Sequence, residues 1–149
     1  GTRSLPLASR AMSDLGLATN GATVPLATSW DPQHPQERII DGKENTFWAT
    51  TGMFPQEVVI TLGARAQVSR ITTVTNGVRR LSVEVCKGEQ PVEFDKLVPE
   101  TEISSQGGQR HSEVFSVAQT EVQHIKVVIH AGWDHFVALY SVEIQGQPV

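Results

Sequence analysis

The chain has 149 residues, of which 39% are hydrophobic and 19% charged, and its formal net charge is −4 at pH 7. This composition is typical of a globular domain, and the length fits one domain with a sizeable core. The acidic balance, with no basic cluster larger than Arg79-Arg80, argues against a nucleic-acid surface or a strong anionic-membrane patch.

The start of the chain and its single cysteine indicate the compartment. Residues 1–13 show no sustained hydrophobic period and are expected to form a flexible lead-in, in which Gly1-Thr2 reads as an added remnant. No apolar run is long enough to cross a bilayer, and no apolar signal region is present. Cys86 is the only cysteine, so no disulfide can form within the chain. We therefore expect one soluble, intracellular domain over residues 14–149.

Short apolar alternations follow, each interrupted by Gly, Pro or Asn. Modest strands are expected at 14–19 and 22–30, and Pro25 places the second at an edge or a bulge because proline cannot donate to a ladder. The clearest period-two runs cover 56–63, 79–88, 124–132 and 139–146, with further β-rich runs at 70–77 and 112–118. The residues expected to face inward are Val58, Ile60, Leu62, Leu81, Val83, Val85, Ile125, Val127, Ile129, Tyr140, Val142 and Ile144, whereas Arg80, Ser82 and Glu84 are expected to face outward.

The helical signal is weak by comparison. Its best candidate, 34–42, spans barely two turns, and residues 103–112 are rich in Gly, Ser and Gln and predict a surface loop. At least eight short strands separated by turn residues predict an all-β antiparallel sandwich or jelly roll.

No established catalytic motif supports an enzyme. The chain has no Gly-x-Ser-x-Gly elbow, phosphate-binding glycine loop or His-Glu-x-x-His helix. Asp134 and His135 are adjacent, but neighbouring residues in a strand point to opposite faces. A zinc site from His130 and His135 would need two more ligands. We therefore expect no catalysis and no small-molecule substrate.

An oxygen-rich turn runs from Asp41 to Thr46. Asp41 offers a carboxylate, Gly42 lets the chain reverse, and Thr46 offers a hydroxyl, and Ca²⁺ prefers hard oxygen ligands of this kind. An Asp-Gly pair is also an ordinary turn, so spacing alone leaves both interpretations open.

Bulky apolar residues follow this turn and recur near the end of the chain. We expect Phe47 or Trp48 to fill the core, together with Tyr140. Met53, Phe54 and Trp133 lie in loop-like, glycine-containing stretches, where clustered apolar residues indicate either core or interface.

Two motifs carry a resemblance to a known family. The turn "IIDGKENTFW" (39–48) and the closing run "FVALYSVEIQG" (136–146) resemble those of galactose-binding-like, discoidin-type (coagulation factor 5/8 type C) jelly rolls. The resemblance covers about 14–146 and implies one structural Ca²⁺ beside the Asp-Gly turn. Carried over by position, the implied ligands are the Arg38 and Lys43 carbonyls, Asp41, Thr46 and Glu143.

A narrower resemblance concerns partners. "TTGMFPQE" (50–57) and "DHF" (134–136) are similar to the family of twenty-five-kilodalton subunits of the intraflagellar transport B complex. It implies a non-enzymatic subunit that pairs with and stabilises a Rab-like small GTPase, subunit twenty-seven of the complex, alongside other complex B subunits. It also implies a location in cilia or flagella and in the cytoplasm near the basal body. We expect the partner contact at Met53, Phe54, Trp133 and Phe136, with Arg79-Arg80 and His135 at its rim.

The alternative is a carbohydrate-binding module, since many relatives of this jelly roll bind sugars. Trp30 and Trp133 would then stack on a sugar ring. The lone Cys86 and the missing secretion signal argue against it. Membrane binding is a weaker alternative because it needs a basic collar, which an acidic chain lacks.

Overall fold

The structure is a computed structural model that describes residues 14–50, 53–104, 108–134 and 136–149. The predicted lead-in, residues 1–13, lies outside this range. The elements in chain order are η1 (Ala18–Asn20), β1 (Thr23–Ala27), η2 (Gln36–Ile40), β2 (Trp48–Thr50), β3 (Gln56–Asn76), β4 (Val78–Cys86), β5 (Asp95–Glu102), β6 (His111–Gly132) and β7 (Val137–Pro148). None of the described helices has the length and apolar character needed to span a bilayer.

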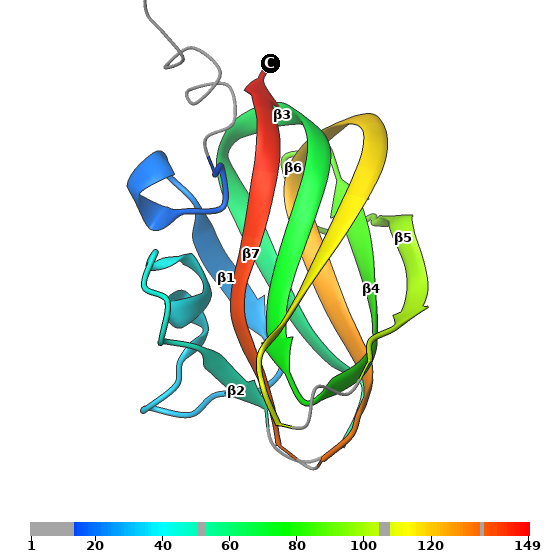
Figure 1. Ribbon diagram of the computed structural model, residues 1–149. Coiled ribbons are helices and arrows are strands. Elements are labelled where there is room, and N and C mark those ends of the chain that lie inside the picture. The colour runs from blue at the N-terminus through cyan, green and yellow to red at the C-terminus, as the bar shows by residue number, and fades with distance from the viewer. Residues whose placement is uncertain (1–13, 51–52, 105–107, 135) are drawn as a thin grey trace, which may run out of the picture.

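The strands build a two-layered antiparallel sandwich (Figure 1). Hydrogen bonding follows the order β2-β7-β3-β6-β4-β5, and β1 also pairs with β3. The two longest strands, β3 and β6, pass through both layers. The first half of β3 pairs with β1 and the last half of β6, and its second half pairs with β7 and the first half of β6.

Irregular pairing lets β3 and β6 change layer. Their register shifts between Thr61 and Ala66 and again between Val68 and Arg70. Such interruptions bend a strand and increase its twist. The runs predicted separately at 56–63 and 70–77 are therefore one strand, as are those at 112–118 and 124–132.

The core lies between the two layers and follows the predicted alternation. All the residues predicted to face inward are buried except Tyr140, which is half-buried where the register of β7 shifts. Trp48 is fully buried, so the prediction that Phe47 or Trp48 fills the core is confirmed for Trp48. Pro25 lies in β1, which among the described strands pairs only with β3, and it falls at a register shift, as predicted.

Several local predictions differ from the structure. Residues 14–19 do not form a strand: Asp14 makes one isolated bridge to Gln145, and η1 follows. The weak helical candidate at 34–42 forms only a short 3₁₀ helix, η2. β2 was missed because three residues are too short to show a period, and β5 because Pro99 and its many charged residues obscure one.

Candidate functional site

The oxygen-rich turn begins where η2 ends. Ile39 and Ile40 are buried and anchor η2 to the core, and Asp41 caps its C-terminus. Gly42 has φ of 74°, a left-handed conformation that glycine adopts without a steric penalty. The chain reverses here, and the Lys43 N–H donates to Asp41 Oδ1 at 2.9 Å.

Three of the predicted calcium ligands meet in this turn. Thr46 Oγ1 lies 2.8 and 2.7 Å from the two carboxylate oxygens of Asp41. It also lies 3.4 Å from the Lys43 carbonyl oxygen. The Arg38 guanidinium is 4.0 Å from Asp41 Oδ2, so Arg38 also approaches the turn through its side chain. The turn therefore concentrates hard oxygen atoms, which are the ligands that Ca²⁺ prefers.

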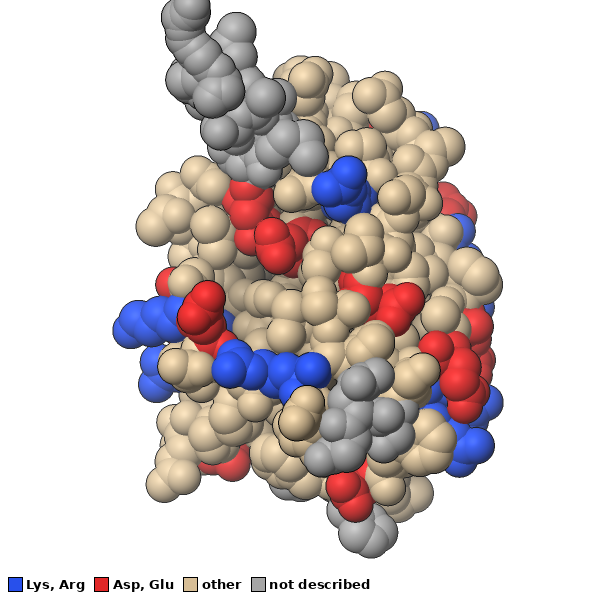
Figure 2. All heavy atoms as spheres, viewed as in Figure 1, with Lys and Arg blue, Asp and Glu red and all other residues tan. Residues whose placement is uncertain are grey.

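Glu143 approaches the same turn from β7. It lines a hollow together with Gly42, Lys43 and Tyr140, on the outer face of the layer that contains β7. Figure 2 shows this hollow, bordered by both acidic and basic side chains. Arg110 lies at its rim with its guanidinium carbon 4.8 Å from the Tyr140 ring centroid. The structure thus brings Glu143 and the turn to one concave surface.

Carboxylates alone do not make this a metal centre. Within the described ranges, no three or more His, Cys, Asp and Glu side chains lie close enough together to hold a metal ion. An ion here would depend on carbonyl and hydroxyl oxygens as well as on Asp41 and Glu143. The zinc site from His130 and His135, which the sequence did not support, involves His135, and that residue lies outside the described residues.

Asp14 lines the hollow and was not predicted to take part in it. Its Oδ1 accepts from the N–H groups of Gly16 and Ile144, at 2.8 and 2.9 Å. Burial raises the pKa of Asp14 above 3.8, and these two hydrogen bonds oppose the rise. The charged carboxylate is therefore less favourable in the folded protein than in the unfolded chain.

The substitution Asp14→Asn is expected to raise the melting temperature near neutral pH. An amide oxygen can accept both backbone hydrogen bonds without the burial of a charge. Because the folded-state pKa of Asp14 is the higher one, its contribution to stability grows as pH falls through that pKa toward 3.8. The increase in melting temperature caused by Asp14→Asn should therefore become smaller as the pH is lowered. Melting curves of both proteins across this range would check it, and a pH-independent difference would contradict it.

A second feature gathers at the end of the sandwich where β2, β4, β6 and β7 begin or end. Four large apolar side chains are exposed in the loops there, and we name them the loop-end surface: Trp30, Met53, Trp133 and Phe136. Met53 is the most exposed, at 84%. Of the predicted partner residues, Met53, Trp133 and Phe136 therefore lie at the surface. Phe54 is half-buried against the core, and His135 lies outside the described residues.

Hydrogen bonds hold these loops to the sheets. The Gln56 side chain accepts from the hydroxyls of Thr28 and Ser29, both at 2.6 Å, and donates to the Met53 carbonyl at 2.6 Å. This places the segment before Trp30 beside Met53. Sequence reasoning missed Gln56 because a glutamine at the start of a strand gives no pattern.

Trp133 is held from two sides. Its backbone N–H donates to the Gly77 carbonyl at 2.7 Å, and its ring N–H donates to the Ile103 carbonyl at 3.2 Å. The Arg79 guanidinium carbon lies 4.9 Å from its ring centroid, and Arg79 also pairs with Glu102 at 3.4 Å. Arg79 therefore lies beside Trp133 at the edge of the loop-end surface.

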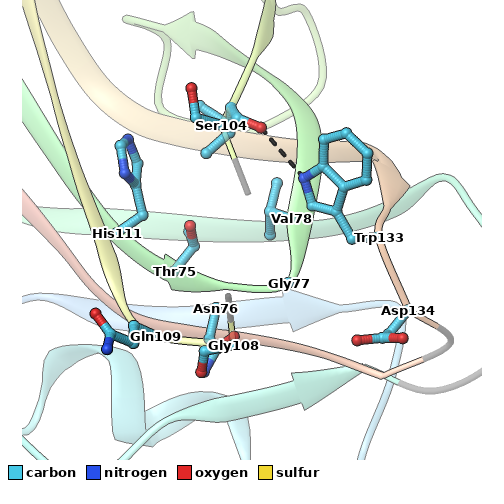
Figure 3. Close-up of a pocket in the computed structure, with 11 residues that line it drawn as sticks. Thr75, Asn76, Gly77, Val78, Ser104, Gly108, Gln109, His111, Trp133 and Asp134 are labelled. Atoms are coloured by element: carbon cyan, nitrogen blue, oxygen red, sulfur yellow. Dashed lines mark hydrogen bonds between the residues drawn. The ribbon is translucent and has the colours of Figure 1, made fainter. Parts of the chain in front are cut away.

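A small pocket opens beside Trp133, with His111 on the opposite wall (Figure 3). Two of its polar side chains have partners: His111 Nε2 is 2.6 Å from Glu113, and Asn76 donates to the Gly108 carbonyl at 2.8 Å. One face of the Trp133 ring is occupied by Arg79.

One arrangement resembles a hydrolytic triad. Ser82 Oγ is 2.8 Å from His130 Nε2, and His130 Nδ1 is 3.8 Å from Glu100. Ser82, predicted to face outward, is instead 0% exposed and hydrogen-bonded to His130. A substrate cannot reach a buried serine, and 3.8 Å is too long for a hydrogen bond to orient the imidazole. The group is a structural network between β4, β5 and β6.

Comparisons with known proteins agree with this architecture. The model of the F5/8 type C domain family matches residues 22–142. Intraflagellar transport protein 25 of Chlamydomonas reinhardtii is 38% identical, covering 91% of this chain and 70% of that protein. The intraflagellar transport protein 25 homolog of Homo sapiens is 34% identical, covering 91% of this chain and 94% of that protein.

A solved structure supports the fold. The family 32 CBM of C. perfringens NanJ, in complex with galactose, superposes with a TM-score of 0.73 at 20% identity, covering 89% of this chain and 97% of that one. Similarity at this level of identity shows the fold alone. It confirms the predicted galactose-binding-like jelly roll.

Proposed function

Because this chain belongs to the F5/8 type C domain family and, more narrowly, to the intraflagellar transport protein 25 family, we propose that it pairs with and stabilises a Rab-like small GTPase. Its membership makes it an intraflagellar transport subunit associated with cilia and flagella. The pairing would attach the GTPase to complex B. The role of this chain would be to bind its partner and not to catalyse a reaction.

The observation that carries this proposal is the loop-end surface. Exposed aromatic and methionine side chains are enriched at the centres of protein interfaces, and a cluster of them at one end of a soluble domain indicates a docking site. Arg79 beside Trp133 adds a charged rim. Gln56 and the hydrogen bonds of Trp133 hold the loops in place, which limits the ordering that binding requires.

Co-expression with the Rab-like GTPase of the same complex tests the pairing. Co-elution of both chains in one size-exclusion peak is expected, together with a higher melting temperature of the GTPase than it has alone. Separate elution at micromolar concentrations would contradict the proposal. A glycan array serves as the counter-test, because specific sugar binding would favour the carbohydrate-module alternative.

We also propose that the turn holds one structural Ca²⁺. The ligands would be the carbonyls of Arg38 and Lys43, the carboxylates of Asp41 and Glu143, and Thr46. The support is the donor chemistry: Asp41, Thr46 and the Lys43 carbonyl already meet, and Glu143 lines a hollow with Lys43 of the same turn. An ion would join the turn to β7, which connects segments far apart in the sequence, and long closures of this kind restrict the unfolded chain most.

Removal of calcium is expected to lower the melting temperature without unfolding the protein at room temperature. An ion at a hundredfold excess over its Kd adds about 2.7 kcal/mol, which corresponds to about 5–10 °C for a domain of this size. Melting curves with added calcium and with a chelator would measure the difference.

Asp41→Ala should remove this calcium dependence, and Asp31→Ala provides the matched control. Asp31 also accepts a backbone N–H two residues ahead, from Gln33 at 2.9 Å, but it lies outside the proposed ligand set. The control should keep the calcium-dependent shift. Equal melting temperatures of the unmodified protein with calcium and with chelator would remove the ion from this account.

A further inference from the structure

The first half of β6 forms a rim of the sandwich. Residues 111–119 belong to the layer that also contains β7 and the second half of β3, and Figure 1 shows this stretch in yellow at the side of that layer. β3 pairs with one side of it, from Thr75 opposite His111 to Arg70 opposite Ser116. β4 pairs with β6 only from His124 onward. Among the described residues, no strand pairs with the other side of 111–119.

Other strands at the rims of the sandwich carry features that block pairing. β1 contains Pro25, and β5 contains Pro99 together with four charged residues. β2 spans three residues of the described part of the chain. Proline, charge and shortness are the devices by which proteins protect strand edges. By contrast, the first half of β6 is long and has no proline. Apart from His111, its only charged residue is Glu113.

The side chains on this stretch suit a pairing partner. Those on its outer face are small and uncharged, and all four are exposed: Ser112, Val114, Ser116 and Ala118. Val114 is 55% exposed. On the inner face, Phe115 and Val117 pack against the core but remain only partly buried. A strand laid along this edge would cover both residues as well as Val114, and it would pair backbone groups that now face the open edge.

We propose that residues 111–119 of β6 are a docking edge to which an extended peptide segment of a partner protein adds as a further strand. The segment would alternate β-branched residues with small or basic ones. Backbone hydrogen bonds would supply the affinity, and the alternating side chains the specificity. Of this edge, only His111 comes near the loop-end surface, on the pocket wall opposite Trp133, so a peptide along 112–119 and the GTPase would contact different residues.

Charge favours a basic segment over a second copy of this chain. From His111 to Ile125 the chain has two acidic residues, Glu113 and Glu121, and no Lys or Arg. Arg110, just before the strand, points away toward Asn45, 3.2 Å from its side-chain oxygen. Edge-to-edge pairing of two copies would place like charges along one interface of a chain whose net charge is already −4.

The test uses the full chain and a synthetic peptide that alternates valine with lysine and threonine. Amide chemical shifts of the isotope-labelled protein are expected to change within 111–119 and in the adjoining part of β3, with added protection from hydrogen exchange. The same peptide with threonine in place of each lysine should bind more weakly. Shift changes confined to other strands or loops, or equal affinity of the two peptides, would overturn the proposal.

Val114→Lys is the decisive variant. It removes the most exposed apolar side chain of the edge and adds a charge that repels a basic peptide, so we expect about tenfold weaker binding. Val92→Lys makes the same change at an exposed position between β4 and β5 and should bind as the unmodified protein does. Equal affinity of the two variants would refute the docking edge. A monomer–dimer equilibrium that Val114→Lys abolishes would show that the occupant is a second copy instead.

Discussion

Met53→Asp is expected to abolish co-elution with the Rab-like GTPase while leaving the fold unchanged. Met53 is 84% exposed, so its side chain stabilises the free protein little. In the proposed complex it would be buried, and a methionine buried on binding contributes about 1.5–3 kcal/mol. An unpaired carboxylate in the same place adds a desolvation penalty. Together these terms weaken binding by about a hundredfold or more, which titration calorimetry would measure.

The matched control is Val92→Asp. Val92 is 75% exposed and lies between β4 and β5, beyond the end of β4 opposite the loop-end surface, so the variant adds the same charge elsewhere. It should bind the GTPase with unchanged affinity. If Met53→Asp folds, as judged by its melting curve, and still binds like the control, the loop-end surface is not the contact.

Phe54 needs a different interpretation from Met53, although the sequence placed the two together. A Cβ at Gly132 would lie 2.8 Å from the Phe54 ring, so the ring packs directly against the turn that leads to Trp133. Changing Phe54 would therefore disturb the positions of both loops as well as any contact. A binding loss at Phe54 alone does not distinguish positioning from contact, whereas a loss at Met53 does.

The periodicity of the sequence was enough to predict the fold because each half-buried strand alternates regularly. Val58, Ile60 and Leu62 all face the core, as the pattern required. The pattern did not predict how the runs connect, since register shifts in β3 and β6 depend on contacts between distant strands. It also misplaced Ser82, because period two gives the face of a residue but not what covers that face.

The sequence predicted the candidate site only where its residues are close together in the chain. Asp41, Lys43 and Thr46 lie within six positions, so a turn brings them together and a local motif can reveal it. Glu143 was predicted from the family resemblance. Asp14 was predicted neither from a local motif nor from that resemblance. Asp14 reaches the hollow through an isolated bridge to Gln145 on β7, a contact across most of the chain that no local pattern encodes.

The turn and the loop-end surface meet at Phe47. Its ring stacks on His34 with centroids 4.1 Å apart, and it meets Phe136 edge-on at 6.2 Å and Tyr140 at 5.1 Å. Tyr140 lines the hollow, whereas Phe136 belongs to the loop-end surface. This aromatic cluster gives a contiguous packed connection between the proposed ion and the proposed partner contact. Trp48, the next residue, faces the core.

Trp48→Ala should have the largest effect on stability of any change discussed. The side chain is 0% exposed, and its ring N–H donates to the Ser29 carbonyl at 3.0 Å. Replacing a buried tryptophan by alanine costs about 3–5 kcal/mol, because the core loses contacts and keeps a cavity. That is a large part of the 5–15 kcal/mol typical of a domain. Urea unfolding followed by circular dichroism would measure the loss.

Trp30→Ala is the matched control for this prediction, since it removes the same side chain from an exposed position. Its effect on the free energy of unfolding should lie within about 0.5 kcal/mol. Because Trp48 anchors the segment that begins at Asp41, the losses from Trp48→Ala and Asp41→Ala should add up to more than the loss in the double variant when calcium is present. If the two losses in free energy of unfolding were strictly additive, the turn and the core beneath it would stabilise the protein independently. We do not expect this, because residues 41–48 connect them directly.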